Sequence, residues 1–249
     1  MVALVKKELL ILFKTPFGWL LFGTLHLVLG YMFLSRLALL LRIQPQLELL
    51  PENPGIGELL IAPFYGDLAT VLLFATPLVT MRLLSEERLR GTLTLLLSAP
   101  LAVWEIVLGK FLGVLIALLL LLLSLTLLPL TTLLGTDLDW GRCFACLLAS
   151  ALILALFAAV GLFGSSLVRH PAASAAITLA FLLFLTVIDW AAVPGTASGE
   201  LLLYFAPFHH FENLKSGLVT TSDLGYFLLA ILLFLFLTHQ RLEKLRRWP

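Results

Sequence analysis

The sequence SEERLRGTLTLLLSAPLAVWEIVLGKFLG, residues 85–113, separates two long apolar stretches of the chain. It begins with charged residues and continues as a short apolar segment, a proline break and a second segment that runs into the next apolar stretch. The charged residues at its start are Glu86, Glu87, Arg88 and Arg90. A membrane protein needs such a segment where a partner on one side of the membrane acts on its helices. The segment is therefore the first candidate for a functional contact.

The composition of the chain is that of a membrane protein. Of its 249 residues, 61% are hydrophobic and only 12% are charged, whereas soluble domains carry about 25% charged residues. The formal net charge of +1 argues against nucleic acid as a partner. The longest gap between apolar stretches is about 30 residues, which leaves no room for a soluble catalytic domain. We therefore expect a single transmembrane domain, residues 1–249.

Six stretches of the chain reach the roughly 20 apolar residues that a helix needs to cross a bilayer. They are Phe17–Leu39, Phe64–Leu84, Ile106–Leu134, Cys143–Val168, Ala172–Ala192 and Leu224–Gln240. Backbone groups in hydrocarbon must be satisfied within each segment, so these stretches are predicted to be helices rather than open strands. The expected fold class is an all-α integral membrane protein with six transmembrane helices.

Lysine and arginine residues indicate the orientation of these spans, because such residues gather in cytoplasmic loops. One side carries Lys6, Lys7, Lys14, Arg82, Arg88, Arg90, Lys110, Arg169, Arg241, Lys244, Arg246 and Arg247. The other side carries only Arg36, Arg42, Arg142 and Lys215. We therefore expect both termini in the cytoplasm.

Three segments outside the spans have distinct patterns. Residues 1–15 place apolar residues at helical spacing and lysines on another face, which predicts an N-terminal elbow helix in the interface; the alternative is a solvated basic leader. The outer loop Arg42–Pro63 is rich in proline and glycine and is predicted to be irregular. Leu201–Leu218 is aromatic, amphipathic and broken by Pro207. It is too short and polar to span, so we expect an outer re-entrant helical segment.

Residues 85–105 are predicted to form a cytoplasmic coupling helix between the second and third spans. Ser85 is a plausible cap for its first helix. Gly91 interrupts this helix, and Thr92 is predicted to cap a short second one, Leu93–Leu97. Pro100 sits where it could begin another helix, which continues into the third span. The expected result is a helix–break–helix lever that is rigidly attached to the third span.

Small residues mark two places for close helix packing. Gly109 and Gly113 form a G-x-x-x-G pattern at the base of the third span, and small residues also fill Gly161–Ser166 and Ala172–Ala176. Small residues let helix backbones approach each other within a membrane. These positions predict helix contacts, either inside one subunit or between two.

Several of these elements occur together in one known family. They are Glu86-Glu87-Arg88, Gly91-Thr92-Leu93, Leu95-Leu96-Leu97, Ala99-Pro100, Glu105-Ile106-Val107-Leu108-Gly109-Lys110-Phe111 and Ala206-Pro207-Phe208-His209-His210-Phe211-Glu212-Asn213. In these residues the chain resembles the permease subunits of type-2 ABC exporters, particularly the gliding-motility-associated branch. The resemblance covers nearly the whole chain. Thr94 departs from it, because an acidic residue is expected there.

The resemblance implies a mechanical role rather than an enzymatic one. Similar permeases pair with two cytoplasmic ATPase subunits, which bind ATP and Mg, and with a second permease that is a copy or a relative. The residues expected to contact the ATPase are Glu86, Glu87, Arg88, Arg90, Gly91, Thr92 and Leu93. The chain itself lacks a phosphate loop, because Gly109-Lys110 has neither the upstream glycine nor the following Ser or Thr. The expected setting is the bilayer of a bacterial inner membrane, and the cargo stays open.

The outer re-entrant segment is predicted to act as a gate or as a docking element. Its candidate residues are Pro207, Phe208, His209, His210 and Phe211. A periplasmic or outer-side subunit is left open as a further partner.

A second interpretation comes from the membrane CAAX-type proteases, whose elements are echoed by Glu86-Glu87, by Phe205 before His209 and by His209 before Asn213. A glutamate and two histidines could activate a water molecule, directly or through a metal. The predicted orientation opposes this, because it separates Glu86 from His209 by roughly 30 Å of hydrocarbon.

Other polar residues in the spans have simple explanations. A secondary transporter would need coupled acidic residues at mid-membrane or matching broken helices, and the sequence has neither. Cys143 and Cys146 have no further metal ligands nearby in sequence and are expected to be small helix residues. His26 and Asp189 could line a substrate route, but a structural role is preferred for each.

Overall fold

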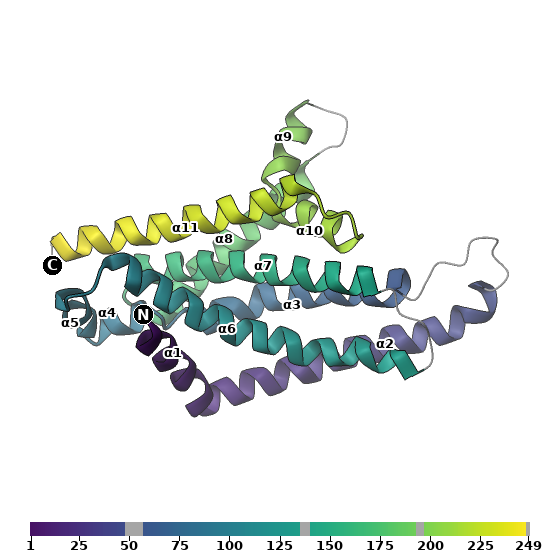
Figure 1. Ribbon diagram of the computed structural model, residues 1–249, viewed down its shortest axis with the longest axis horizontal. Coiled ribbons are helices and arrows are strands. Elements are labelled where there is room, and N and C mark those ends of the chain that lie inside the picture. Colours follow the sequence, from purple (N-terminus) through teal and green to yellow (C-terminus); the bar gives the residue numbers. More distant parts are fainter. Residues whose placement is uncertain (48–56, 135–139, 193–196, 248–249) are drawn as a thin grey trace.

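A computed structural model of the protein describes residues 1–47, 57–134, 140–192 and 197–247. Within these ranges all regular secondary structure is helical (Figure 1). The helices in chain order are α1 (Val2–Lys14), α2 (Pro16–Leu47), the π-helix η1 (Gly57–Ile61), α3 (Ala62–Thr80), α4 (Ser85–Leu89), α5 (Thr92–Ser98), α6 (Val103–Leu130), the 3₁₀ helix η2 (Thr131–Leu134), α7 (Trp140–Leu167), α8 (Pro171–Ala191), α9 (Ala197–Phe205), α10 (Pro207–Lys215) and α11 (Thr221–Arg247). The prediction of an all-α fold is therefore confirmed for the described part of the chain.

Six segments of the described chain are long and apolar enough to cross a membrane. They are Pro16–Ile43, Leu59–Leu89, Val103–Leu130, Trp140–Leu167, Pro171–Ala191 and Thr221–Arg247. The six predicted spans are thus confirmed, and the chain is a multi-pass membrane protein. The last helix is longer than predicted, because it continues past Gln240 to Arg247 as a basic, water-compatible extension.

The loop predicted to be irregular, Arg42–Pro63, is largely helical where it is described. Helix α2 continues through Pro45 to Leu47, and η1 begins at Gly57. The prediction was wrong for these residues, because a high content of proline and glycine does not by itself exclude a helix. Pro63, for example, lies in the first turn of α3, where the missing N–H costs no hydrogen bond. Residues 48–56 lie outside the described part of the chain.

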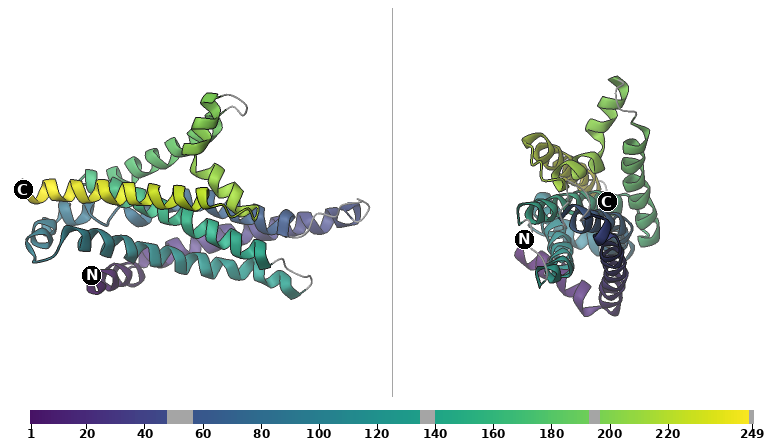
Figure 2. Two further views of the ribbon diagram at one scale, coloured as in Figure 1. Left: turned by 45° about the horizontal axis from the view of Figure 1, so that its top comes forward. Right: turned by 90° about the vertical axis from the view of Figure 1, so that its right-hand side faces the viewer.

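Helix α7 forms the centre of the bundle. In its most apolar window 67% of the residues are buried, against 17% in the corresponding windows of α2 and α8. In Figure 2 helix α8 diverges from the other spans toward α9, which agrees with its low burial. The outer surfaces of α2 and α8 are apolar and exposed, as expected for helices that face lipid.

Several of the small residues singled out in the sequence pack within the subunit, whereas Ala172, Ala173 and Ala176 are exposed. A Cβ atom added to Gly161 of α7 would lie 2.6 Å from Cβ of Thr80 in α3. A Cβ on Gly113 would lie 2.8 Å from Cβ of Glu8, and one on Gly109 would lie 3.1 Å from Cβ of Leu4. The G-x-x-x-G pattern of α6 therefore receives α1, and Gly161 receives α3. None of these three glycines is free to face a second subunit.

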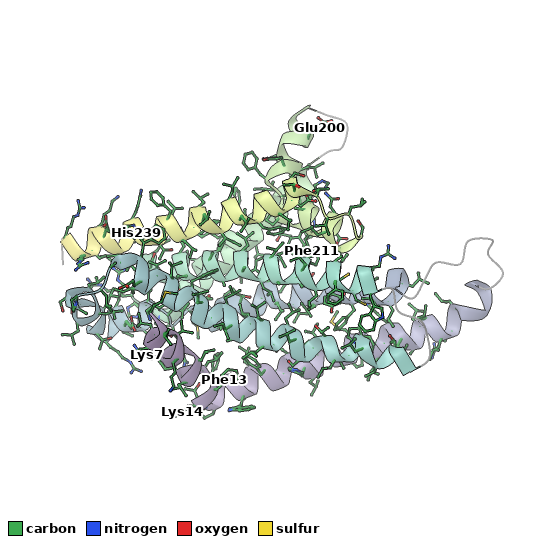
Figure 3. All side chains as sticks on the ribbon, in the orientation of Figure 1. Lys7, Phe13, Lys14, Glu200, Phe211 and His239 are labelled. Carbon is green, nitrogen blue, oxygen red and sulfur yellow. The ribbon has the colours of Figure 1, made fainter. Side chains whose placement is uncertain are left out.

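The bundle has two distinct ends (Figure 1). Helices α1, α4 and α5 and the C-terminal end of α11 gather at one end, which we call the basal end. Helices α9 and α10 lie toward the opposite end, which we call the outer end. Figure 3 shows Lys7 and Lys14 on α1, whereas Glu200 lies on the projecting helix α9 and Phe211 points into the bundle. The break predicted at Pro207 separates α9 from α10.

Candidate functional site

The connection between α3 and α6, residues 81–102, forms a compact projection at the basal end of the bundle. Helix α4 ends at Leu89, and Gly91 adopts a left-handed conformation with a φ of 72° before α5 begins. An L-residue with a side chain rarely adopts such a φ, so glycine suits this turn. The predicted helix–break–helix form is present, and we call α4, the Gly91 turn and α5 the coupling segment.

The helix caps of the coupling segment differ from those predicted. Ser85 is the first residue of α4 rather than its cap, and its hydroxyl donates to the carbonyl oxygen of Met81. Thr92 is the first residue of α5, and its hydroxyl donates to the carbonyl oxygen of Glu87, 3.3 Å away. Pro100 precedes α6, which begins at Val103. The hydroxyls thus bond backward to carbonyl groups, a local alternative to capping.

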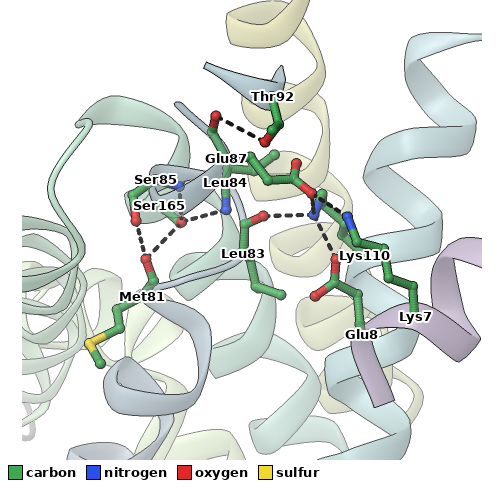
Figure 4. Close-up of polar contacts among 10 residues, drawn as sticks. All are labelled: Lys7, Glu8, Met81, Leu83, Leu84, Ser85, Glu87, Thr92, Lys110 and Ser165. Atoms are coloured by element: carbon green, nitrogen blue, oxygen red, sulfur yellow. Dashed lines mark hydrogen bonds and ion pairs between the residues drawn. The ribbon is translucent and has the colours of Figure 1, made fainter. Parts of the chain in front are cut away.

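A serine of α7 anchors the start of the coupling segment (Figure 4). The hydroxyl oxygen of Ser165 accepts hydrogen bonds from the backbone N–H groups of Leu84, at 2.9 Å, and Ser85, at 3.1 Å. The same hydroxyl donates to the carbonyl oxygen of Met81, 3.2 Å away. One hydroxyl therefore satisfies three backbone groups where α3 gives way to α4. Arg88 adds a second link, because it donates to the carbonyl oxygen of Ser166 at 2.8 Å.

A buried lysine of α6 anchors the other side of the segment. Lys110 is only 1% exposed, and its Nζ atom lies 2.7 Å from Oε1 of Glu8 and 3.0 Å from Oε1 of Glu87. Nζ also donates to the carbonyl oxygen of Leu83 at 2.7 Å. The three donors of the ammonium group thus face three acceptors, as burial of a charge requires. Lys110 joins α1, α4 and α6 at one point (Figure 4).

Lys7 completes this charged cluster. Its Nζ atom lies 2.8 Å from Oε1 of Glu87, the same oxygen that Lys110 approaches. Partial burial disfavours the charged form of Lys7, but the hydrogen bond that Lys7 donates to Glu87 and the charges of Glu87 and Glu8 outweigh this effect. The pKa of Lys7 is therefore raised above its ordinary value of 10.5. We call Lys7, Glu8, Glu87 and Lys110 the basal charge cluster.

The predicted coupling residues thus have two different environments. Glu87 and Arg88 bond inward to other helices, and Leu93 is 5% exposed and packs in the core. Glu86 and Arg90 form a more exposed pair with 2.5 Å between Oε1 and the guanidinium nitrogen. The segment also exposes two large apolar side chains, with Leu89 at 52% and Leu95 at 71%. Its inner face is fastened to the bundle, and its outer face presents charge and leucine.

The outer candidates are mostly packed into the fold. Of Pro207, Phe208, His209, His210 and Phe211, three are buried, and Phe208 and His209 are half-buried. Phe208 lies against Phe157 of α7, with 6.4 Å between ring centroids. Their burial reflects the short, amphipathic helix α10, which rests on α7.

His210 holds this packing together. Its Nδ1 atom lies 2.6 Å from Oδ1 of Asp223, and its Nε2 atom lies 3.0 Å from the carbonyl oxygen of Tyr204. One ring nitrogen thus faces a carboxylate and the other faces a backbone carbonyl. Asp223 also accepts from Thr220, which precedes α11. The pair of His210 and Asp223 therefore fastens α10 to the first turn of α11.

The structure does not assemble a protease-like site from the described residues. Glu86 and Glu87 lie in α4 at the basal end, whereas His209 lies in α10 toward the outer end (Figure 1). Within the described ranges no group of three or more His, Cys, Asp or Glu residues is placed to hold a metal ion. Cys146 is buried and its thiol donates to the carbonyl oxygen of Lys215, 3.4 Å away.

The other polar residues of the spans have local explanations. His26 contacts the carbonyl oxygen of Phe22 at 2.8 Å and the hydroxyl of Ser124 at 2.9 Å, so it links α2 to α6. Asp189 is half-buried near the outer end of α8. Arg36 and Asp67 form a two-pronged ion pair between α2 and α3, with distances of 2.5 and 2.7 Å. Local sequence patterns do not predict this ion pair, because 31 positions separate its two residues.

Comparison with known proteins agrees with this architecture. No curated protein matches the chain. The family described as "ABC-2 family transporter protein" matches residues 5–244, which cover the first five spans, the sixth span as far as Lys244, the coupling segment and the outer helices α9 and α10. The chain therefore belongs to the ABC-2 family of transporter membrane proteins.

Proposed function

We propose that the chain is the permease subunit of an ATP-driven complex and that its coupling segment receives the motion of separate ATPase subunits. One observation carries this proposal: the segment is fastened on its inner face by Ser165 and Lys110 while it exposes Leu95 on its outer face. A segment built to transmit force needs rigid attachment on one side and a contact surface on the other. Exposed apolar side chains outside the spans are typical of protein contacts.

The rigid attachment reaches three parts of the bundle. Ser165 ties the segment to α7, and Lys110 ties it to α6 and α1. A displacement of the coupling segment would therefore move these helices together rather than bend a loop. This supports export across the membrane, or transmission of force as in the gliding-motility-associated branch, as the output of the complex.

The distribution of charge supports a cytoplasmic placement of the basal end. That end holds both the basic helix α1 and the basic last turn of α11, with Lys244, Arg246 and Arg247. We propose that both termini lie in the cytoplasm of a bacterial cell, with α1 as an elbow helix in the interface. Two ATPase subunits, which bind ATP and Mg, and a second permease would complete the complex.

The outer helices α9 and α10 are proposed as a re-entrant gate or docking element. Because Pro207, His210 and Phe211 are buried, a partner or cargo would contact α9 and the exposed side chains around it rather than these three residues. Tyr204 and Phe205, at 54% and 59% exposure, supply such a surface.

The test is affinity purification of a tagged chain from its native membranes. We expect an ATP-hydrolysing subunit to co-purify with the unchanged chain. Arg90→Glu and Leu95→Asp should each reduce its recovery, because both residues are exposed on the coupling segment. Lys14→Glu is the matched control, since it changes charge at the far end of α1 (Figure 3). Equal recovery from all three variants, or the absence of an ATPase from the unchanged chain, would overturn the proposal.

A further inference from the structure

A cavity of about 510 Å³ opens between α1, the start of α2, the end of α3, α4 and α6. This volume lies within the roughly 300–1,000 Å³ that small-molecule sites occupy. Its lining includes apolar residues, which we call the apolar wall: Ile11, Leu78, Val79, Val114 and Ala117. It also includes charged residues, which we call the polar wall: Lys7, Glu8, Arg82, Glu86, Glu87 and Arg90. The cavity therefore has the two-sided chemistry of a site for an amphiphile.

The apolar wall continues onto the outside of the bundle. Ile11 of α1 is 44% exposed and Leu78 of α3 is 40% exposed. In a chain whose helices cross a bilayer, exposed apolar side chains beside a span face lipid. A molecule could therefore reach the cavity sideways from the membrane. That this membrane surface is the inner leaflet rests on the proposed function, which places the basal end in the cytoplasm.

The polar wall carries three cations and three carboxylates, and Lys110 behind it adds a fourth cation, so one cation is left without a carboxylate. Glu87 is paired with Lys7 and Lys110, Glu86 with Arg90, and Glu8 with Lys110. Arg82 forms no ion pair with the described residues; its guanidinium carbon lies 4.8 Å from the centre of the Phe17 ring.

The position of Arg82 suits a phosphate group. Stacking on the Phe17 ring limits the motion of the guanidinium group while leaving its N–H donors available. A guanidinium group with free donors matches a phosphate in two-pronged geometry. The polar wall thus has one unmatched positive group in a frame of paired charges.

We propose that this cavity binds one phospholipid, with its phosphate on Arg82 and an acyl chain along Ile11, Leu78 and Val114. The lipid would lie between α1 and the spans and would contact residues of the basal charge cluster. A ligand that binds only the folded arrangement stabilises it by an amount that grows with the ratio of ligand concentration to Kd. The lipid would therefore hold α1 against the bundle next to the coupling segment.

The test uses the full chain, purified without partners and stripped of lipid in detergent. Native mass spectrometry would measure the binding of phosphatidylglycerol, of diacylglycerol with the same acyl chains, and of inorganic phosphate. We expect one molecule of added phosphatidylglycerol to bind to each chain and to raise its thermal unfolding temperature. Diacylglycerol and inorganic phosphate should bind at least about tenfold more weakly, because each lacks half of the recognised chemistry.

Two variants locate the site. Arg82→Gln should weaken phosphatidylglycerol binding at least about tenfold, because the phosphate would lose its charged hydrogen-bond donor, while the lipid-free unfolding temperature stays unchanged. Leu78→Trp should also reduce binding, because the indole would fill the cavity from its open side. Arg169→Gln is the control, since it removes an exposed basal arginine that does not line the cavity.

Equal binding of phosphatidylglycerol to the unchanged chain and to Arg82→Gln would overturn this site. So would equal binding of diacylglycerol, which would indicate an ordinary lipid annulus. Neither result bears on ATPase recovery through Arg90 and Leu95, so the two proposals can fail separately.

Discussion

Nζ of Lys110 lies 2.7 Å from Oε1 of Glu8, although 102 residues separate the two in sequence. This ion pair is almost closed to solvent, since the side chains are 1% and 10% exposed. It joins the N-terminal helix α1 to the third span, directly behind the coupling segment.

Replacing Lys110 with methionine should destabilise the fold strongly. Glu8 would then lose its partner in a buried position, and Glu87 would keep only Lys7. Removing one member of a buried ion pair costs about 3–5 kcal/mol, because the remaining charge is left unpaired. Thermal unfolding in detergent measures the change, with Lys14→Met as the control on the exposed end of α1. A variant as stable as the control would contradict the role assigned to the cluster.

Removing the hydroxyl of Ser165 should loosen the coupling segment. In Ser165→Ala the N–H groups of Leu84 and Ser85 would lose their acceptor in a buried position. Each unsatisfied buried group costs about 1–3 kcal/mol. Hydrogen–deuterium exchange should therefore become faster around residues 84–89. Ser98→Ala is the control, because Ser98 is exposed and bonds only to its own helix; equal protection in both variants would refute the anchor.

A side chain at Gly161 should force α7 and α3 apart. The added Cβ of Gly161→Ala would meet Cβ of Thr80 at 2.6 Å, and overpacking of this kind typically costs about 1–3 kcal/mol. Thr80→Gly should restore much of the stability in the double variant, because it removes the clashing atoms. Gly225→Ala is the control, since no atom lies within 4 Å of its added Cβ. The measurement is the unfolding temperature of Gly161→Ala, of Thr80→Gly, of the double variant and of Gly225→Ala. If Gly161→Ala is as stable as Gly225→Ala, α7 and α3 do not pack as described.

The pair of Lys7 and Glu87 should add stability only below strongly alkaline pH. The folded chain holds the proton of Lys7 more tightly than the unfolded chain, because the pKa of Lys7 is raised above 10.5. The stabilisation is thus complete below the ordinary pKa and is lost as pH rises through the raised value. Since Lys7 is half-exposed, we expect only about 0.2–1 kcal/mol between the unchanged chain and Lys7→Gln at neutral pH. If the stability difference between the unchanged chain and Lys7→Gln stays the same at pH values above the raised pKa of Lys7, the ion pair is not its source.

The local patterns of the sequence predicted the architecture well. Span positions follow from runs of apolar residues, and the breaks at Gly91 and Pro207 follow from the backbone limits of those two residue types. Such signals lie within a few neighbouring positions. The sequence therefore supplied the six spans, α1, the coupling segment and the paired outer helices before their arrangement in space was known.

The hydrogen bonds and ion pairs that hold the coupling segment against the bundle could not be predicted in the same way. Ser165 bonds to Leu84 across 81 positions, and Lys110 bonds to Glu8 across 102. In the sequence Ser165 looks like one more small packing residue, and Lys110 like a lysine at the edge of a membrane span. Their partners depend on which helices become neighbours, and hydropathy does not determine that. The prediction of an irregular loop at Arg42–Pro63 was wrong for its described residues, which are largely helical. Local content of proline and glycine does not by itself exclude a helix.

Helix α7 is in contact with both proposed working parts of the molecule. Near its basal end Ser165 holds the coupling segment, and near its outer end Cys146 bonds to the backbone at the end of α10. Its 28 residues extend for about 42 Å as a single uninterrupted rod. A small translation or tilt of this helix would displace its contacts at the basal end and at the outer end at the same time. Communication across the bilayer would then need no relay of side chains, only a stiff helix that is held at both ends.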